Sequence, residues 1–126
     1  MSYPTDREYT RDHEWIALDG DVARVGLTGY AAEALGEAVF VDPPAAGDRL
    51  SAGAACGEIE SVKSVSDLIA PADGEVLGVN QQVVDEPSLA TSDPYEQGWL
   101  YTMRPDGEPS DLLDAEAYAA LVEEEG

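Results

Sequence analysis

The sequence contains one lysine, Lys63, one histidine, His13, and one cysteine, Cys56. A single cysteine excludes an internal disulfide and a cysteine cage for a metal ion. The single histidine lies in the sequence HEW, which lacks the second histidine of a zinc-binding helix. A GxSxG elbow and a GxxxxGK phosphate loop are also absent. We therefore expect no metal site and no enzyme activity, with His13 at least partly exposed and Cys56 packed as a small apolar side chain.

Basic residues are scarce as well: 27 acidic residues stand against 6 basic ones, and the formal net charge is −21. Such a surface repels nucleic acids and anionic membranes, so neither is an expected partner. No apolar run approaches the roughly 20 residues needed to cross a bilayer. The N-terminal sequence MSYPTDREYT lacks the basic and apolar regions of a signal peptide, which predicts a cytoplasmic protein.

The acidic charge has two explanations, an adaptation to a salty cytosol or an acidic docking face, and both can hold. We favour a salt-adapted, halophilic organism.

Repulsion among the carboxylates destabilises the folded state at low ionic strength, and salt screens that repulsion. The melting temperature should therefore rise as KCl is added from low concentration. A melting temperature that stays constant or falls would contradict this prediction.

The 126 residues suit one domain, with a core from about residue 9 to 122 and peripheral ends at 1–8 and 123–126. Turn residues separate short apolar segments, which predict strands at 14–18, 22–27, 38–41, 55–61, 67–70, 75–80 and 99–103. Helices are predicted at 29–35, between Thr28 and Gly36, and at 115–122 after Asp114. One helical turn is expected at 86–90, and residues 123–126 should fray. This pattern predicts a mainly β fold, either a small sandwich or a barrel.

Lys63 lies where two strand-rich halves of the chain, residues 53–62 and 65–79, would meet in a hairpin. A hairpin tip is exposed, and Glu60 and Asp67 would favour the charged amine over a Schiff base or a general base. Acylation by another enzyme suits such an amine better than either of these reactions, because it removes the charge and attaches a cofactor on a long tether. The alternative is an ordinary solvated surface lysine.

Residues 60–67, ESVKSVSD, closely resemble the lipoylation loop of the H proteins of the glycine cleavage system. The similarity extends from residue 9 to about residue 122, in the family's order and spacing, through YTRDHEW (9–15), GLT (26–28), YA (30–31), LGE (35–37), VFV (39–41), PADGEV (71–76), VN (79–80), DPY (93–95), GWL (98–100) and LLDAEAY (112–118). Three positions differ from the usual pattern: Cys56 replaces a bulkier residue, residues 42–44 (DPP) replace acidic-Leu-Pro, and Ala34 replaces a histidine that lines a cleft in some members.

The resemblance implies a lipoyl/biotinyl-like barrel-sandwich hybrid with the lysine at a hairpin tip, a short helix near the N-terminus and a C-terminal helix. Lys63 would carry lipoic acid in amide linkage, on an arm of roughly 14 Å. Glu14 and Asp67 would face the cleft that shelters the loaded arm, and a carboxylate there pairs with a protonated amine. Glu60 and Asp67 are the candidate residues that the lipoate-attaching enzyme recognises.

The implied role is a carrier, not an enzyme. The carrier takes an aminomethyl group from the pyridoxal-phosphate-dependent glycine decarboxylase and presents it to an aminomethyltransferase that uses tetrahydrofolate. It then passes electrons to the FAD- and NAD-dependent dihydrolipoamide dehydrogenase. We expect the carrier to be monomeric.

Four other roles were weighed against this one, and three of them remain open. The lipoyl domains of 2-oxoacid dehydrogenases are shorter and usually have Asp-Lys-Ala at the tip, whereas this chain has Val-Lys-Ser. A biotinyl domain would have methionines beside the lysine, and Val62 and Ser64 exclude that role. An H-like relay protein that donates lipoate to other carriers would have nearly the same sequence. An unmodified interaction domain that keeps only the fold is the last alternative.

Overall fold

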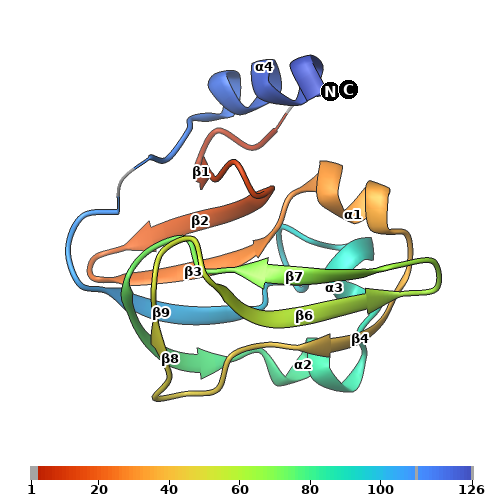
Figure 1. Ribbon diagram of the computed structural model, residues 1–126, viewed down its shortest axis with the longest axis horizontal. Coiled ribbons are helices and arrows are strands. Elements are labelled where there is room, and N and C mark those ends of the chain that lie inside the picture. Colours follow the sequence, from red (N-terminus) through yellow and green to blue (C-terminus); the bar gives the residue numbers. More distant parts are fainter. Residues whose placement is uncertain (1–2, 110, 126) are drawn as a thin grey trace.

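The computed structural model describes residues 3–109 and 111–125, which form two antiparallel sheets (Figure 1). The first sheet has six strands in the order β1 (Glu8–Tyr9), β2 (Glu14–Asp19), β3 (Val22–Leu27), β9 (Tyr101–Pro105), β8 (Gly74–Val79) and β5 (Arg49–Leu50). The second sheet has three strands in the order β4 (Ala38–Asp42), β6 (Ala55–Ser61) and β7 (Val65–Ile69).

The main hydrophobic core contains side chains from both sheets. The three-stranded sheet contributes Val41, Ile59 and Leu68, and the six-stranded sheet contributes Val25 and Met103, all of them buried. Alternate residues of a strand point to opposite faces, so each sheet keeps one apolar face for this core. The predicted mainly β fold is confirmed, and its strands form two open sheets instead of a closed barrel.

Two of the predicted helices have the expected beginnings. Helix α1 (Gly29–Leu35) is capped by Thr28, whose Oγ1 accepts the backbone N–H of Ala31 at 3.2 Å. Helix α4 (Ala115–Glu125) is capped by Asp114, whose Oδ1 accepts the N–H of Ala117 at 2.8 Å. In both cases a side chain satisfies an N–H group that the helix leaves free, which is why the sequence located these starts.

The segment between β8 and β9 differs from the prediction. Two short helices, α2 (Gln81–Asp85) and α3 (Leu89–Ser92), occupy it instead of one turn at 86–90. Asn80 explains the difference, because its Oδ1 accepts from the N–H of Gln82 and begins α2. Its Nδ2 donates to the carbonyl oxygens of Gln97 and Trp99, which delays the last strand until Tyr101.

An aromatic cluster attaches α4 to the first strands. Tyr9 of β1 stacks on Tyr118 of α4, with ring centroids 4.9 Å apart, and Tyr3 meets Tyr118 edge-on. Helix α4 continues to Glu125, whose Oε1 lies 3.2 Å from Nε2 of His13. The expectation that residues 123–125 fray was therefore wrong, and Gly126 lies outside the described residues.

The described residues offer few cationic partners for the many carboxylates. Their ion pairs join Arg7 to Asp6, Arg49 to Asp106, Arg104 to Asp21 and His13 to Glu125. Most acidic side chains therefore contribute repulsion without a compensating pair, in line with the predicted salt dependence. In the part of the chain that the structure describes, no helix is both long and apolar enough to span a membrane.

Candidate functional site

Lys63 lies at the tip of the β6–β7 hairpin, which projects at one end of the molecule (Figure 1). The last ladder pair is Glu60 with Val65, so only residues 61–64 form the turn. Lys63 is exposed, and its neighbour Val62 keeps 73% of its surface accessible. The structure thus places the single lysine at a protruding hairpin tip, as predicted.

The buried side chain of Ser61 holds the turn. Its Oγ accepts the N–H of Lys63 at 3.3 Å and that of Ser64 at 3.1 Å, while the Ser61 N–H donates to the Ser64 carbonyl at 2.8 Å. Tight hairpin turns usually need positive φ angles. Among the described residues, the only non-glycine residues with positive φ are His13 and Asp111, so hydrogen bonds to Ser61 fix this turn instead. Sequence reasoning missed Ser61, although serine is a common turn residue.

The tip also contacts the end of helix α1. The N–H of Val62 donates to the carbonyl of Glu37 at 3.3 Å. Gly36 ends α1 with φ of +80°, which a side chain rarely adopts, and a Cβ there would lie 3.3 Å from Cε of Lys63. The glycine therefore serves two purposes: it allows the helix to end and it leaves room for the lysine side chain.

Glu14, the first residue of β2, is buried, with 3% of its surface exposed. Its Oε2 accepts the N–H of Ile69 at 2.8 Å and so connects the six-stranded sheet to β7, an edge strand of the other sheet. Its Oε1 has no hydrogen-bond partner among the described residues. Burial raises the pKa of the Glu14 carboxyl to about 8, against a smaller lowering by the Ile69 hydrogen bond and a small further rise from Asp12.

This raised pKa predicts a pH dependence of stability. A folded-state pKa of about 8, above the ordinary 4.5, means that the folded state holds the Glu14 proton more tightly than the unfolded state does. The contribution of Glu14 is therefore fully present below pH 4.5 and is lost as the pH rises toward 8. Relative to Glu14→Gln, the wild type should lose roughly 4 to 5 kcal/mol of unfolding free energy across this window. Denaturant unfolding of both proteins at several pH values measures the difference, and parallel pH profiles would contradict the prediction.

Lys63 and Glu14 mark the two ends of β7. Lys63 precedes the strand by two residues, and Glu14 accepts a hydrogen bond from the backbone of its last residue, Ile69. Asp67 lies between them, exposed and opposite Glu58 of β6. The structure thus arranges Lys63, Asp67 and Glu14 along one edge strand without direct contact between the lysine and Glu14.

His13 and Cys56 both make contacts that hold the fold together. Nδ1 of His13 lies 2.8 Å from the Tyr118 hydroxyl, which connects the turn before β2 to α4. Cys56 is partly buried against the core, with its Sγ 3.8 Å from the Tyr101 hydroxyl. Burial raises the pKa of the Cys56 thiol to about 11, which disfavours the nucleophilic thiolate at neutral pH.

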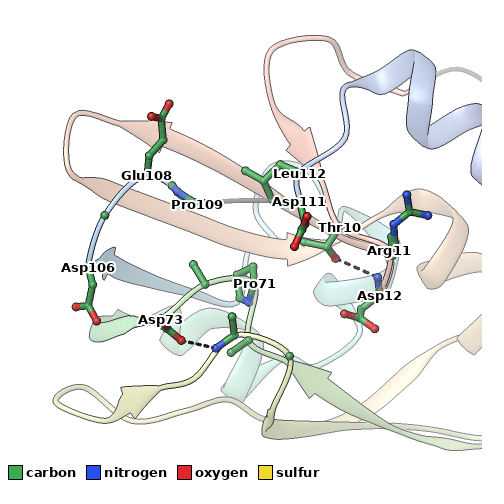
Figure 2. A pocket seen from close by; sticks show the side chains of 15 residues that line it. Thr10, Arg11, Asp12, Pro71, Asp73, Asp106, Glu108, Pro109, Asp111 and Leu112 are labelled. Atoms are coloured by element: carbon green, nitrogen blue, oxygen red, sulfur yellow. Dashed lines mark hydrogen bonds between the residues drawn. The ribbon is translucent and has the colours of Figure 1, made fainter.

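A surface cavity of about 370 Å³ lies among the loops formed by residues 10–12, 52–53, 70–73, 106–109 and 111–112 (Figure 2). Two of its polar side chains make local hydrogen bonds: Asp73 accepts the N–H of Ala52 at 2.8 Å, and Thr10 accepts that of Asp12 at 3.2 Å. Lys63 and the three carboxylates proposed with it do not line this cavity. Among the described residues, no histidine, cysteine, aspartate and glutamate side chains form a group that suits a metal ion.

Comparison with known proteins agrees with this geometry. The family model described as glycine cleavage H-protein matches residues 7–125, nearly the whole chain. The chain belongs to the glycine cleavage H-protein family. A glycine cleavage system H protein from Thermobifida fusca is 53% identical over 126 residues, covering 100% of both chains. Another from Beutenbergia cavernae is 56% identical over 122 residues, covering 97% of this chain and 98% of its own.

A solved H-protein structure shows the same fold. The crystal structure of a glycine cleavage system H protein from Mycobacterium marinum matches with a TM-score of 0.90 and 49% identity. The match covers 95% of this chain and 98% of the other. Membership of the H-protein family favours a place in the glycine cleavage system over a 2-oxoacid dehydrogenase lipoyl domain or a biotinyl domain.

Proposed function

We propose that this H-protein family member is the lipoyl carrier of the glycine cleavage system, with lipoic acid attached to Lys63. The observation that supports this role most strongly is that the single lysine of the chain lies at the tip of an exposed hairpin. The turn bonds of Ser61 hold the backbone of the tip, so the lysine amine reaches another enzyme without local unfolding. The carrier itself catalyses no step.

Glu14 is proposed to bind the amine of the aminomethyl group that the arm carries. A buried carboxyl oxygen without a partner is costly, and a protonated amine is the group that would satisfy it. When bound, the lipoyl group would supply a disulfide that is reduced as it takes up the aminomethyl group, and the dithiol left after that group is transferred would give two electrons to the dehydrogenase. The proton of the Glu14 carboxyl would pass to the incoming neutral amine and form an ammonium–carboxylate pair, and the buried position of Glu14 beside the end of β7 would keep that pair away from water.

Asp67 and Glu60 keep the roles proposed from the sequence. Asp67 is exposed on β7 between the lysine and Glu14, where it could meet the arm or the attaching enzyme. Glu60 is exposed beside the tip, opposite Val65. Both carboxylates therefore lie within reach of a protein that approaches the tip.

The proposed partners are the glycine decarboxylase, the aminomethyltransferase, the dihydrolipoamide dehydrogenase and a lipoate-attaching enzyme. We propose that the carrier meets them in the cytoplasm as a monomer. The net charge of −21 favours partners whose docking faces are basic and is consistent with a salt-adapted source.

An aminomethylation assay tests the proposed function. The lipoylated chain is incubated with glycine decarboxylase, pyridoxal phosphate and glycine, and its intact mass is followed. We expect the added mass of one aminomethyl group, which disappears when aminomethyltransferase and tetrahydrofolate are supplied. A lipoylated chain that is not loaded, but donates lipoate to other carriers, would instead be a lipoyl relay protein.

A further inference from the structure

On the outer face of the three-stranded sheet, two exposed apolar side chains flank a glutamate beside the lysine. Phe40 of β4, Glu60 of β6 and Val65 of β7 lie directly opposite one another, so their side chains share one face. In the next row, Val41 and Ile59 are buried and point to the other face, toward the core, and their partner Ser66 on β7 is exposed. We call Phe40, Glu60 and Val65 the tip row. Phe40 is 51% exposed and Val65 is 58% exposed.

An acid row follows the tip row on the same face. Asp42, Glu58 and Asp67 lie directly opposite one another across the three strands, and all three are exposed. Like charges at directly opposed positions destabilise a sheet. Within the described residues, no salt bridge relieves this repulsion. The three strands contain no basic residue, so Lys63 supplies the only positive charge of the hairpin.

The fold does not account for the apolar side chains of the tip row. The core is built from the opposite face of the sheet, and Phe40, the single phenylalanine of the chain, contributes little to it. Val62 at the tip adds a third exposed apolar side chain. Exposed aromatic and aliphatic side chains with a charged rim are typical of a surface that another protein covers.

We propose that the tip row and the acid row, together with Val62, form the docking surface for the enzyme that acylates Lys63. This inference rests on the proposed lipoylation of Lys63. The mouth of that enzyme's active site would offer an apolar pocket to Phe40 and Val65, and arginine or lysine side chains to the acid row. The partner is thus a lipoate-attaching enzyme with a basic rim around its lysine channel.

The distances favour this partner over the enzymes that act on the finished arm. The Lys63 amine extends about 6 Å from its Cα, so an enzyme that acylates it must contact the tip itself. Val65 is two residues from Lys63, about 7 Å along the strand, and Phe40 lies two strands away, about 10 Å from Val65. An enzyme that acts at the end of a 14 Å arm has no comparable need to cover these side chains.

Acylation kinetics of the full-length apo chain test the proposal. The probes are a bacterial ATP-dependent lipoate ligase, free lipoate and ATP, with intact mass as the readout. The double variant Phe40→Thr/Val65→Thr should raise the KM for the carrier about tenfold and leave kcat within about twofold, because the amine is unchanged. Leu18→Thr is the matched control: Leu18 is 44% exposed on β2, in the other sheet, and its replacement should change neither parameter.

The acid row has its own variant. Asp42→Asn/Glu58→Gln should raise KM several-fold at low salt, and the difference from the wild type should shrink as salt is added. Melting temperatures of all variants, measured by circular dichroism, should stay close to that of the wild type because every substituted side chain is exposed.

The outcomes separate this inference from the proposed function. If the wild type is not acylated at Lys63, the proposed function fails. If the wild type is acylated and the tip-row variant has the same KM, the docking surface is overturned and the carrier role stands. Once fully lipoylated, the Phe40→Thr/Val65→Thr variant should keep its kcat/KM with glycine decarboxylase within about threefold of the wild-type value. An equal loss of kcat/KM with the ligase and with the decarboxylase would overturn the choice of partner.

Discussion

Lys63→Arg is expected to abolish lipoylation, and with it aminomethyl loading, while leaving the fold unchanged. Arginine keeps the positive charge, but its guanidinium is not acylated in place of the amine. The bonds that hold the tip use the backbone N–H groups of residues 62–64 and the Ser61 side chain, so the substitution does not remove them. Intact mass after incubation with lipoate ligase measures the loss, and circular dichroism measures the fold.

The sequence supplies a strict control for this experiment. Because the chain has no second lysine, no neighbouring side-chain amine can replace Lys63 as the acceptor. The variant should therefore keep the mass of the bare chain even after prolonged incubation. A lipoylated Lys63→Arg protein, or one that still accepts the aminomethyl group, would contradict the assignment of the attachment site.

The second large effect is expected at Glu14. Glu14→Ala should speed the loss of the aminomethyl group from the loaded carrier by about 10- to 100-fold, since a hydrogen bond to a charged group contributes roughly 1.5 to 3 kcal/mol. Glu14→Gln should act in the same direction, because an amide can still accept the N–H of Ile69 but has no negative charge for the amine. The rate of ammonia release after removal of the decarboxylase measures the effect.

Glu75→Gln is the control for the charge change. Glu75 is exposed on β8 and pairs with Arg49 in the ladder, in the sheet that does not contain Lys63. Its replacement removes one carboxylate from the same chain and should leave the rate of ammonia release unchanged. Release from the Glu14 variants at the wild-type rate would remove Glu14 from the mechanism.

Local sequence features predicted the parts of the fold that depend on near neighbours. Asp19-Gly20-Asp21 predicted the turn between β2 and β3, and Gly20 has the expected positive φ of 66°. Thr28 and Gly36 bounded α1 correctly, since one caps its start and the other allows its end. The hairpin that exposes Lys63 followed from two strand-like segments on either side of a short polar turn.

Features that depend on distant contacts were not predictable in the same way. The burial of Glu14 results from the packing of β2 against Ile69, 55 residues away, and the sequence alone shows only a glutamate at the start of a strand. Helix α2 was missed because Asn80 was interpreted as the end of a strand, whereas contacts to Gln97 and Trp99 orient it as a helix cap. The alignment of the tip row depends on strand register, which the sequence pattern did not specify.

The intact mass of the protein purified from its native cells tests the central claim most directly. The lipoyl-carrier proposal predicts the bare chain plus one lipoyl group, which peptide mapping should locate on Lys63. A mass equal to that of the bare chain, obtained from cells supplied with lipoate, would contradict it.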